Sequence, residues 1–158
     1  MRIIDGYNVI GAAGEFGLLL SQPDKEERLL RLLAAYRARR RSRAPMLVVF
    51  DGHYGRLASG PRRHTRLGIA VEWAVGETAD AVIERRVRGA ARAGEIDVVT
   101  SDRAVLRAVA SWGARGTRSP DFLGEIAREL AEAPGAEKPE APGADEVAEW
   151  LERFGDGR

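Results

Sequence analysis

Three short apolar runs end in the same way, and they limit the folds that this chain can adopt. Residues 2–5, 46–50 and 95–100 are rich in Ile and Val. An aspartate closes each run, the last one two positions beyond it: Asp5, Asp51 and Asp102. Apolar runs without alternation are typical of strands that are buried on both faces of a parallel sheet. The aspartates would then all follow strand ends.

Helical periodicity fills the sequence between these runs. Leu29, Leu33 and Tyr36 lie on one side of a predicted helix over about 24–43. Similar patterns predict three more helices and two more short strands: helices at 78–93, 103–112 and 120–132, and strands at 67–73 and 114–117. Strands that alternate with helices indicate an α/β fold with a mainly parallel central sheet. Residues 54–66 show no periodicity and are predicted to form a long loop.

The distribution of charge along the chain favours a polyanionic partner. The net charge is +1, yet residues 28–66 contain eleven arginines and one acid, which is a net charge of +10. Residues 121–158 carry a net charge of −7. A basic segment of this kind is typical of proteins that bind nucleic acid, and the alternative interpretation is a solvated, arginine-rich helix.

Composition divides the chain at residue 132. Residues 1–132 are long enough for a single domain with its own core. Residues 133–144 are rich in Pro, Gly and Ala, as linkers are, and residues 145–158 contain a short acidic helix with an apolar face. This helix is interpreted either as a solubilising extension that docks through Trp150 and Phe154, or as a segment that folds back over the basic region.

Cysteine is absent from the chain, which excludes disulfides, thiolate zinc sites and cysteine nucleophiles. No apolar run reaches the roughly 18–20 residues that a membrane span needs. Residues 1–5 are charged too early for a signal peptide. We therefore expect a cytoplasmic protein with no membrane partner, and the oligomeric state is not predicted.

The strand-end aspartates are candidate metal ligands. In a parallel sheet the carboxyl ends of the strands face one crevice, where ligands bind. Asp80, in the first turn of a predicted helix, adds a fourth carboxylate, and Glu84 lies one turn further along. Like charges at close range are costly unless a cation or a proton compensates them, and hard divalent ions take oxygen ligands. Each acid also has a simpler interpretation, as a turn residue, a helix cap or a solvated side chain.

Other acidic and phosphate-binding sites do not fit these residues. A phosphatase of the haloacid dehalogenase type needs a second aspartate two positions after the first, where this chain has Tyr7. A phosphoacceptor receiver domain needs a lysine at a late strand end, and the only lysines are Lys25 and Lys138. The sequence contains no P-loop motif, and His53 and His64 are not spaced as metal ligands.

Four motifs together resemble the NYN domain family of PIN-like nucleases, and most closely its YacP-like branch, which includes a ribosome-associated endoribonuclease. They are Asp5-Gly-Tyr-Asn-Val-Ile10, Val48-Val-Phe-Asp-Gly52, Thr78-Ala-Asp80 and Val98-Val-Thr-Ser-Asp102. The resemblance covers about residues 1–132 and implies a PIN-like three-layer α/β/α fold with a mainly parallel central sheet. It also implies a divalent-metal-dependent cut in RNA. The family often has consecutive acids where this chain has Asp80 and Ala81, which removes one potential ligand.

These observations lead to a prediction of function. The chain is expected to be a metal-dependent endoribonuclease that hydrolyses phosphodiester bonds in RNA, with the ribosome as a candidate platform. The predicted catalytic residues are Asp5, Asn8, Asp80 and Asp102, and Mg²⁺ or Mn²⁺ would be held by Asp5, Asp51, Asp80 and Asp102. The predicted loop would bind the RNA backbone through Arg56, Arg62, Arg63, His64 and Arg66.

The sequence also fits alternative functions. The nearest candidates for base stacking are Tyr7, Tyr54 and Trp73, although each of these side chains is also explained by packing. The same basic segment, together with Ala81, suits an RNA- or ribosome-binding module without catalysis. A structure-specific DNA nuclease is a weaker alternative, since the chemistry of the site does not require a 2′-hydroxyl group.

Overall fold

The computed structural model describes residues 1–52 and 62–132, and within them a central sheet of mainly parallel strands. The strands lie in the order β3-β4-β2-β1-β5-β6. Their bounds are β1 (Arg2–Asp5), β2 (Met46–Asp51), β3 (Arg63–Arg66), β4 (Ile69–Ala74), β5 (Asp97–Val99) and β6 (Arg115–Thr117). All neighbouring pairs are parallel except β3 with β4, so the predicted mainly parallel sheet is confirmed.

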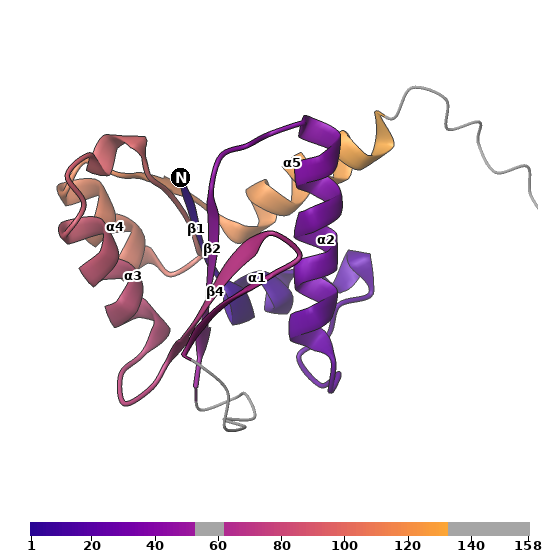
Figure 1. Cartoon of the computed structure of the whole chain (residues 1–158), viewed down its shortest axis with the longest axis horizontal. Helices are drawn as coiled ribbons and strands as arrows, with labels where there is room; N and C mark the ends of the chain where they lie inside the picture. The colour runs from indigo at the N-terminus through magenta and orange to yellow at the C-terminus, as the bar shows by residue number, and fades with distance from the viewer. Residues whose placement is uncertain (53–61, 133–158) are drawn as a thin grey trace, which may run out of the picture.

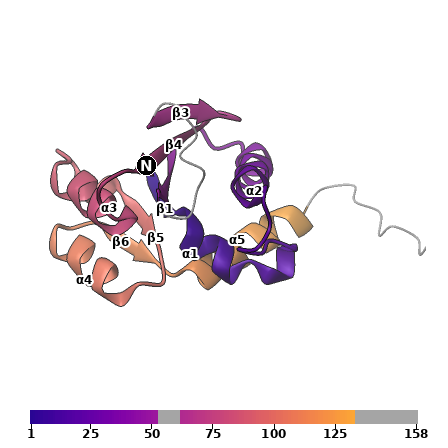
Figure 2. The ribbon, with the colours of Figure 1, turned by 90° about the horizontal axis from the view of Figure 1, so that it is seen from below.

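Helices cover both faces of this sheet, as Figures 1 and 2 show. The helical segments are α1 (Gly6–Ala12), η1 (Gly14–Phe16), α2 (Lys25–Arg40), α3 (Ala79–Arg88), η2 (Ala93–Glu95), α4 (Arg103–Ser111) and α5 (Ser119–Ala131). One apolar core lies between the sheet and α1, α2 and α5, and a second lies between the sheet and α3 and α4. The predicted three-layer α/β/α arrangement is confirmed. No helix in the described part is long and apolar enough to cross a membrane.

The stripe predicted for the long basic helix is the buried face of α2. Leu29, Leu33 and Tyr36 are at most 1% exposed in the first core. The helix ends at Arg41, which adopts a left-handed conformation with φ 49°, and the amides of Arg41 and Ser42 bond back to carbonyls of the last turn. The exposed face of α2 carries most of its arginines, as an amphipathic helix requires.

Two elements correct the expectations from sequence. Helix α1 begins directly after Asp5, where no helix is predicted. Strand β3 occupies residues 63–66, inside the predicted loop, and pairs with β4 through a two-residue turn of Leu67 (φ 52°) and Gly68 (φ 73°). Positive φ at both turn residues matches the twist of a tight hairpin. All four side chains of β3 are exposed, so the strand has no apolar alternation that would predict it.

Several predicted features lie outside the described residues. They are the first part of the predicted loop with Tyr54 and Arg56, the linker over 133–144 and the acidic helix within 145–158.

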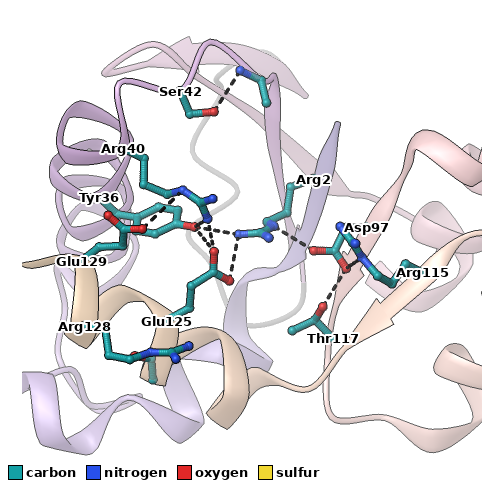
Figure 3. A network of polar contacts seen from close by, with 12 residues as sticks. Arg2, Tyr36, Arg40, Ser42, Asp97, Arg115, Thr117, Glu125, Arg128 and Glu129 are labelled. Carbon is teal, nitrogen blue, oxygen red and sulfur yellow. Dashed lines mark hydrogen bonds and ion pairs between the residues drawn. The ribbon is translucent and has the colours of Figure 1, made fainter.

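A polar network ties the layers together at the edge where β1 begins (Figure 3). Arg2 on β1 donates to Asp97 at 2.9 Å and to the hydroxyl group of Tyr36 at 3.0 Å. Tyr36 in turn donates to Glu125 on α5 at 2.5 Å, and Arg40 on α2 also pairs with Glu125. The network joins the strands to α2 and α5, and it lies at the edge of the sheet opposite to the strand-end aspartates.

Candidate active site

The register of the sheet brings the strand-end acids to one edge. Strand β1 lies between β2 and β5. Asp5 is the partner of Val49, so Asp51 lies two residues further along the neighbouring strand. Ile4 is the partner of Val99, so Asp5 is level with Thr100, two residues before Asp102. Asp80 reaches the same edge from the first turn of α3, a helix that packs on β1, β2 and β4.

Asp5 is the most buried of these acids, with 8% of its surface exposed. The pKa of its carboxyl group is raised to about 6, chiefly by burial and also by the nearby charges of Asp80 and Asp102. The hydroxyl group of Thr100 donates to Asp5 Oδ2 at 3.1 Å, and this bond acts in the opposite direction, toward a lower pKa. Asp5 therefore lies in a buried environment where its own negative charge is unfavourable.

Asp80 shares this negative field. The residue is half-buried, and burial raises the pKa of its carboxyl group. The charges of Asp102, Glu84 and Asp51 raise it as well, in that order of size. Thr78 caps α3 by accepting the amide of Ala81, so Asp80 is not needed as the cap of its helix.

Asp102 caps a helix, as its simpler interpretation proposes. Its Oδ1 accepts the amides of Ala104 at 2.8 Å and Val105 at 3.1 Å in the first turn of α4. Its other oxygen, Oδ2, accepts no hydrogen bond from the residues that the structure describes. A cap through Oδ1 therefore leaves the second oxygen able to face a ligand.

Asn8 holds the turn that carries Asp102. Its Oδ1 accepts the amide of Ser101 at 2.8 Å and the hydroxyl group of Ser119 at 2.7 Å. Through these bonds α1 is joined both to the end of β5 and to the start of α5. In this arrangement Asn8 positions the acids, because its amide oxygen is already used within the protein.

Two further residues, Thr100 and Ser119, belong to this site although no single motif predicts them. Thr100 is fully buried, donates to Asp5 and accepts the amide of Asp102 at 3.2 Å, so it links two of the acids. Ser119 is also fully buried, and its hydroxyl group donates to Asn8. Thr100 lies within the motif that ends at Asp102, so the sequence could have indicated its place in the site. Nothing in the sequence around Ser119 indicates that it contacts α1.

The acids at this edge differ from most others in the chain, because arginine does not neutralise them. In the described residues, Asp5, Asp80, Glu84 and Asp102 form no ion pair with Arg or Lys. Nine other described acids do form one: Asp24, Glu26, Glu27, Glu72, Glu77, Glu95, Asp97, Glu125 and Glu129. An uncompensated group of carboxylates, partly buried, favours a bound cation.

The oxygen donors at this edge fit a hard divalent ion such as Mg²⁺ or Mn²⁺ in chemistry. As the side chains lie, however, no three Asp, Glu or His residues in the described ranges form a group that could hold a metal ion. The charges of Asp80 and Asp102 nevertheless raise the pKa of Asp5, so these acids share one electrostatic environment at this edge.

Three of the four predicted RNA-binding arginines fall within the described residues, where they lie on β3 or next to it and contact other parts of the protein. Arg63 pairs with Glu72 at 3.1 Å, and Arg66 pairs with Glu27 at 3.0 Å. Arg62 donates to the carbonyl oxygen of Val75 at 2.9 Å. All three side chains are exposed, as is His64 between them. Their charge is thus partly balanced by acids that are distant in sequence.

Two of the aromatic candidates for base stacking, Tyr7 and Trp73, pack against the ring of Phe50. Tyr7 and Phe50 have ring centroids 5.2 Å apart, and Phe50 and Trp73 have theirs 5.0 Å apart. The hydroxyl group of Tyr7 donates to Glu26 at 2.7 Å. These contacts agree with the interpretation of Tyr7 and Trp73 as packing residues.

Comparison with known proteins gives this geometry a family. The model of the YacP-like NYN domain matches residues 2–149. The crystal structure of Rae1 (YacP) from Bacillus subtilis is similar at 27% identity and a TM-score of 0.67, over 83% of this chain and 75% of the other. A mutant of that protein gives 26% identity and a TM-score of 0.66, over 82% and 76%. No curated protein matches the chain significantly.

These findings confirm the PIN-like α/β fold and support a nuclease-like function related to RNA. PIN-like NYN nucleases generally use divalent metals. Because the family model matches nearly the whole sequence, the chain belongs to the YacP-like NYN domain family.

Proposed function

We propose that this protein is a divalent-metal-dependent endoribonuclease that hydrolyses phosphodiester bonds in RNA. The observation that carries the proposal is the group of acids at the carboxyl edge of the sheet. Asp5, Asp80 and Asp102 act on one another electrostatically, and none of the three is paired with a described arginine or lysine. Membership of the YacP-like NYN family supports the same function.

In this proposal Asp5, Asp80 and Asp102 hold Mg²⁺ or Mn²⁺, and Asp51 is a further ligand. Such an ion, when bound, lowers the pKa of a coordinated water molecule and stabilises charge on the scissile phosphate. The protein contributes the position of the carboxylates. Thr100 orients Asp5 through its hydroxyl group, and the capping bonds orient Asp102.

The substrate would be held largely through its backbone. Arg62, Arg63, His64 and Arg66 are exposed on one edge of the sheet, and together with Arg56 they are proposed to contact phosphates. Contacts of this kind add affinity and salt dependence but little choice of sequence. Selection of the cleavage site would then depend on a platform that presents the RNA, and we propose the ribosome in the cytoplasm for this role.

A second candidate function is an RNA- or ribosome-binding module without catalysis. Two observations favour it. Ala81 stands where the family often has a further acid. The side chains in the described ranges also form no group of three that could hold an ion as they lie.

Cleavage of RNA by single-site variants distinguishes these functions. A single-stranded RNA is incubated with the full chain and Mn²⁺, and Asp80→Asn and Asp102→Asn are compared with the wild type. Each variant should cleave at least about 100-fold more slowly, the size of loss seen when one electrostatic group is removed from an active site. Glu132→Gln, an exposed acid at the far end of α5, is the matched control and should cleave normally.

Each outcome has a definite meaning. Variants that cleave as fast as the wild type would refute the acid site. A wild type that binds RNA but does not cleave it with Mn²⁺ or Mg²⁺ would support the binding module. Equal cleavage of RNA and of a DNA with the same sequence would support the weaker alternative, a DNA nuclease.

A further inference from the structure

A basic pocket lies at the opposite edge of the sheet from the acids. An open pocket of about 520 Å³ forms where α2 ends and the β3–β4 turn approaches it. Its charged lining consists of Arg37, Arg41 and Arg43, and no acid lines it. The chain enters β2 from this end of α2, whereas Asp51 lies where β2 finishes (Figure 1). The pocket is therefore separate from the proposed active site.

The arginines of this pocket have no acidic partner among the described residues, unlike Arg40 beside them in the sequence. Arg40 pairs with Glu125 and Glu129, within the network of Figure 3. Within the described ranges, Arg37, Arg41 and Arg43 form no ion pair. Three cations around one pocket repel one another, and an anion between them would relieve that repulsion.

Arg37 has an unused donor. Its Nη1 donates to the carbonyl oxygen of Gly68 in the β3–β4 turn, which holds the guanidinium group at the pocket wall. Its Nε is the buried side-chain atom in the described residues that has no hydrogen-bond partner. A buried donor without an acceptor is energetically unfavourable. A phosphate oxygen bound in the pocket would bring an acceptor close to this group.

We propose that this pocket binds the phosphate backbone of an RNA segment that lies away from the cleavage site. The inference rests on the proposed function, in which RNA is the substrate. The guanidinium group matches phosphate oxygens with two parallel donors. No aromatic side chain lines the pocket, so it offers no surface on which a base would stack. Its open shape suits a phosphate whose chain continues on both sides, and binding there is independent of sequence.

The distance between the two sites determines how long the RNA must be. Strand β2, with six residues, spans the sheet between the two edges. At about 3.3 Å per residue, the edges are roughly 20 Å apart. A helical nucleic-acid strand advances about 3.4 Å per nucleotide, so about six nucleotides would be needed to reach both sites. An RNA of about four nucleotides should engage one site only.

The test measures RNA binding in EDTA, where cleavage plays no part. The variant Arg41→Gln/Arg43→Gln removes two exposed cations that form no ion pair within the described part of the protein. The matched control, Arg88→Gln/Arg107→Gln, removes two exposed cations from α3 and α4 on the other face of the sheet. Single-stranded RNAs of about 20 and about four nucleotides are titrated against each full-length protein over a range of salt concentrations.

The pocket variant should bind the long RNA about tenfold more weakly than the control, and the slope of log K against log salt should fall by about 1.4, or about 0.7 per lost contact. The short RNA can occupy either site but not both at once, so its affinity should differ less between the two variants than the affinity of the long RNA. Equal affinity of the two variants for the long RNA would overturn the inference. The inference would also be overturned if the pocket bound inorganic phosphate while the substitutions left the affinity for long RNA unchanged, because the site would then bind a free anion.

Failure of this inference and failure of the proposed function are distinguishable. Arginine-dependent binding of long RNA without any cleavage in Mn²⁺ would overturn the proposed catalysis and leave the pocket assigned. Cleavage that requires Asp80 and Asp102, with no effect of Arg41 and Arg43 on binding, would do the reverse. A wild type that does not bind the long RNA would overturn both.

Discussion

Replacing Asp5 by Asn should stabilise the metal-free protein at neutral pH. Burial raises the pKa of this carboxyl group from its ordinary value of 3.8 to about 6. A shift of about 2 pKa units corresponds to about 3 kcal/mol, which is the free-energy cost of ionising Asp5 in the folded state relative to the unfolded chain. Asn is neutral and similar in shape, and its amide oxygen can still accept the bond from Thr100. Its NH₂ group is a new buried donor that costs about 1 kcal/mol, so the net gain should be about 2 kcal/mol.

The direction of the pH dependence follows from proton binding. Between about pH 4 and pH 6 the folded protein holds a proton on Asp5 that the unfolded chain has already released. The contribution of Asp5 to the free energy of unfolding therefore decreases as pH rises through this window. Urea unfolding of the wild type and Asp5→Asn in EDTA, at several pH values, measures this contribution as a difference. The difference should change by about 3 kcal/mol in favour of the variant from about pH 4 to pH 7.5.

A divalent ion should reverse the order of stability. If Asp5 is a ligand, Mn²⁺ at 100 times its dissociation constant would stabilise the wild type by about 2.7 kcal/mol and the variant by much less. Glu132→Gln should follow the wild type throughout, because this exposed acid is far from the site. A difference between wild type and Asp5→Asn that does not vary with pH would refute the argument from burial. Equal stabilisation of both by Mn²⁺ would refute the role of Asp5 as a ligand.

Three further substitutions test the packing around the sheet. Gly6→Ala should destabilise the protein by about 3 kcal/mol, because a Cβ atom there would lie 2.3 Å from Phe50 Cε1; an unchanged Tm would contradict this close approach. Asn8→Ala should lower the free energy of unfolding by about 2 kcal/mol, since it removes the acceptor of two hydrogen bonds; urea unfolding that matches the wild type would show those bonds to be neutral. Glu72→Gln should lower it by about 2–3 kcal/mol, because Arg86 loses a carboxylate at 2.6 Å that is only 7% exposed; a loss below about 0.5 kcal/mol would place this pair with weak surface pairs.

The edge of the sheet that carries the acids could be predicted because local patterns define it. Strands buried on both faces leave continuous apolar runs, and a parallel sheet brings the ends of such runs to one side. These two facts are sufficient to predict that Asp5, Asp51 and Asp102 lie at the same edge. Helix α1 was not predicted because Gly6 and Asn8 disfavour helix interiors, and here tertiary contacts decide: Gly6 allows close approach to Phe50, and Asn8 bonds to two other elements.

The partners of the arginines on β3 and of Arg40 could not be predicted, because these ion pairs join different elements of the fold. The sequence shows one basic segment over residues 28–66. In the structure, Arg63 and Arg66 meet Glu72 and Glu27, and Arg40 meets Glu125, which lies 85 positions away. Among the described residues, ion pairs thus neutralise Arg63 and Arg66 of the predicted loop, whereas Arg37, Arg41 and Arg43 at the end of α2 form none. Charge counted along a sequence therefore overestimates the basic surface where acids from other elements fold against it.

The contrast between paired and unpaired charges also indicates why Asp5, Asp80 and Asp102 lack a counterion. A chain with 23 arginines and two lysines has ample means to neutralise its carboxylates, and it does so at nine of the described acids. Asp5, Asp80 and Asp102 are exceptions even though burial makes the charge of Asp5 and Asp80 unfavourable. An arginine beside them would stabilise the fold but would occupy the place of a cation that comes from solution. Partly buried carboxylates left without a counterion are thus better explained by ligand binding than by folding, and Asp5→Asn would expose that conflict as a gain in stability together with a loss of metal binding.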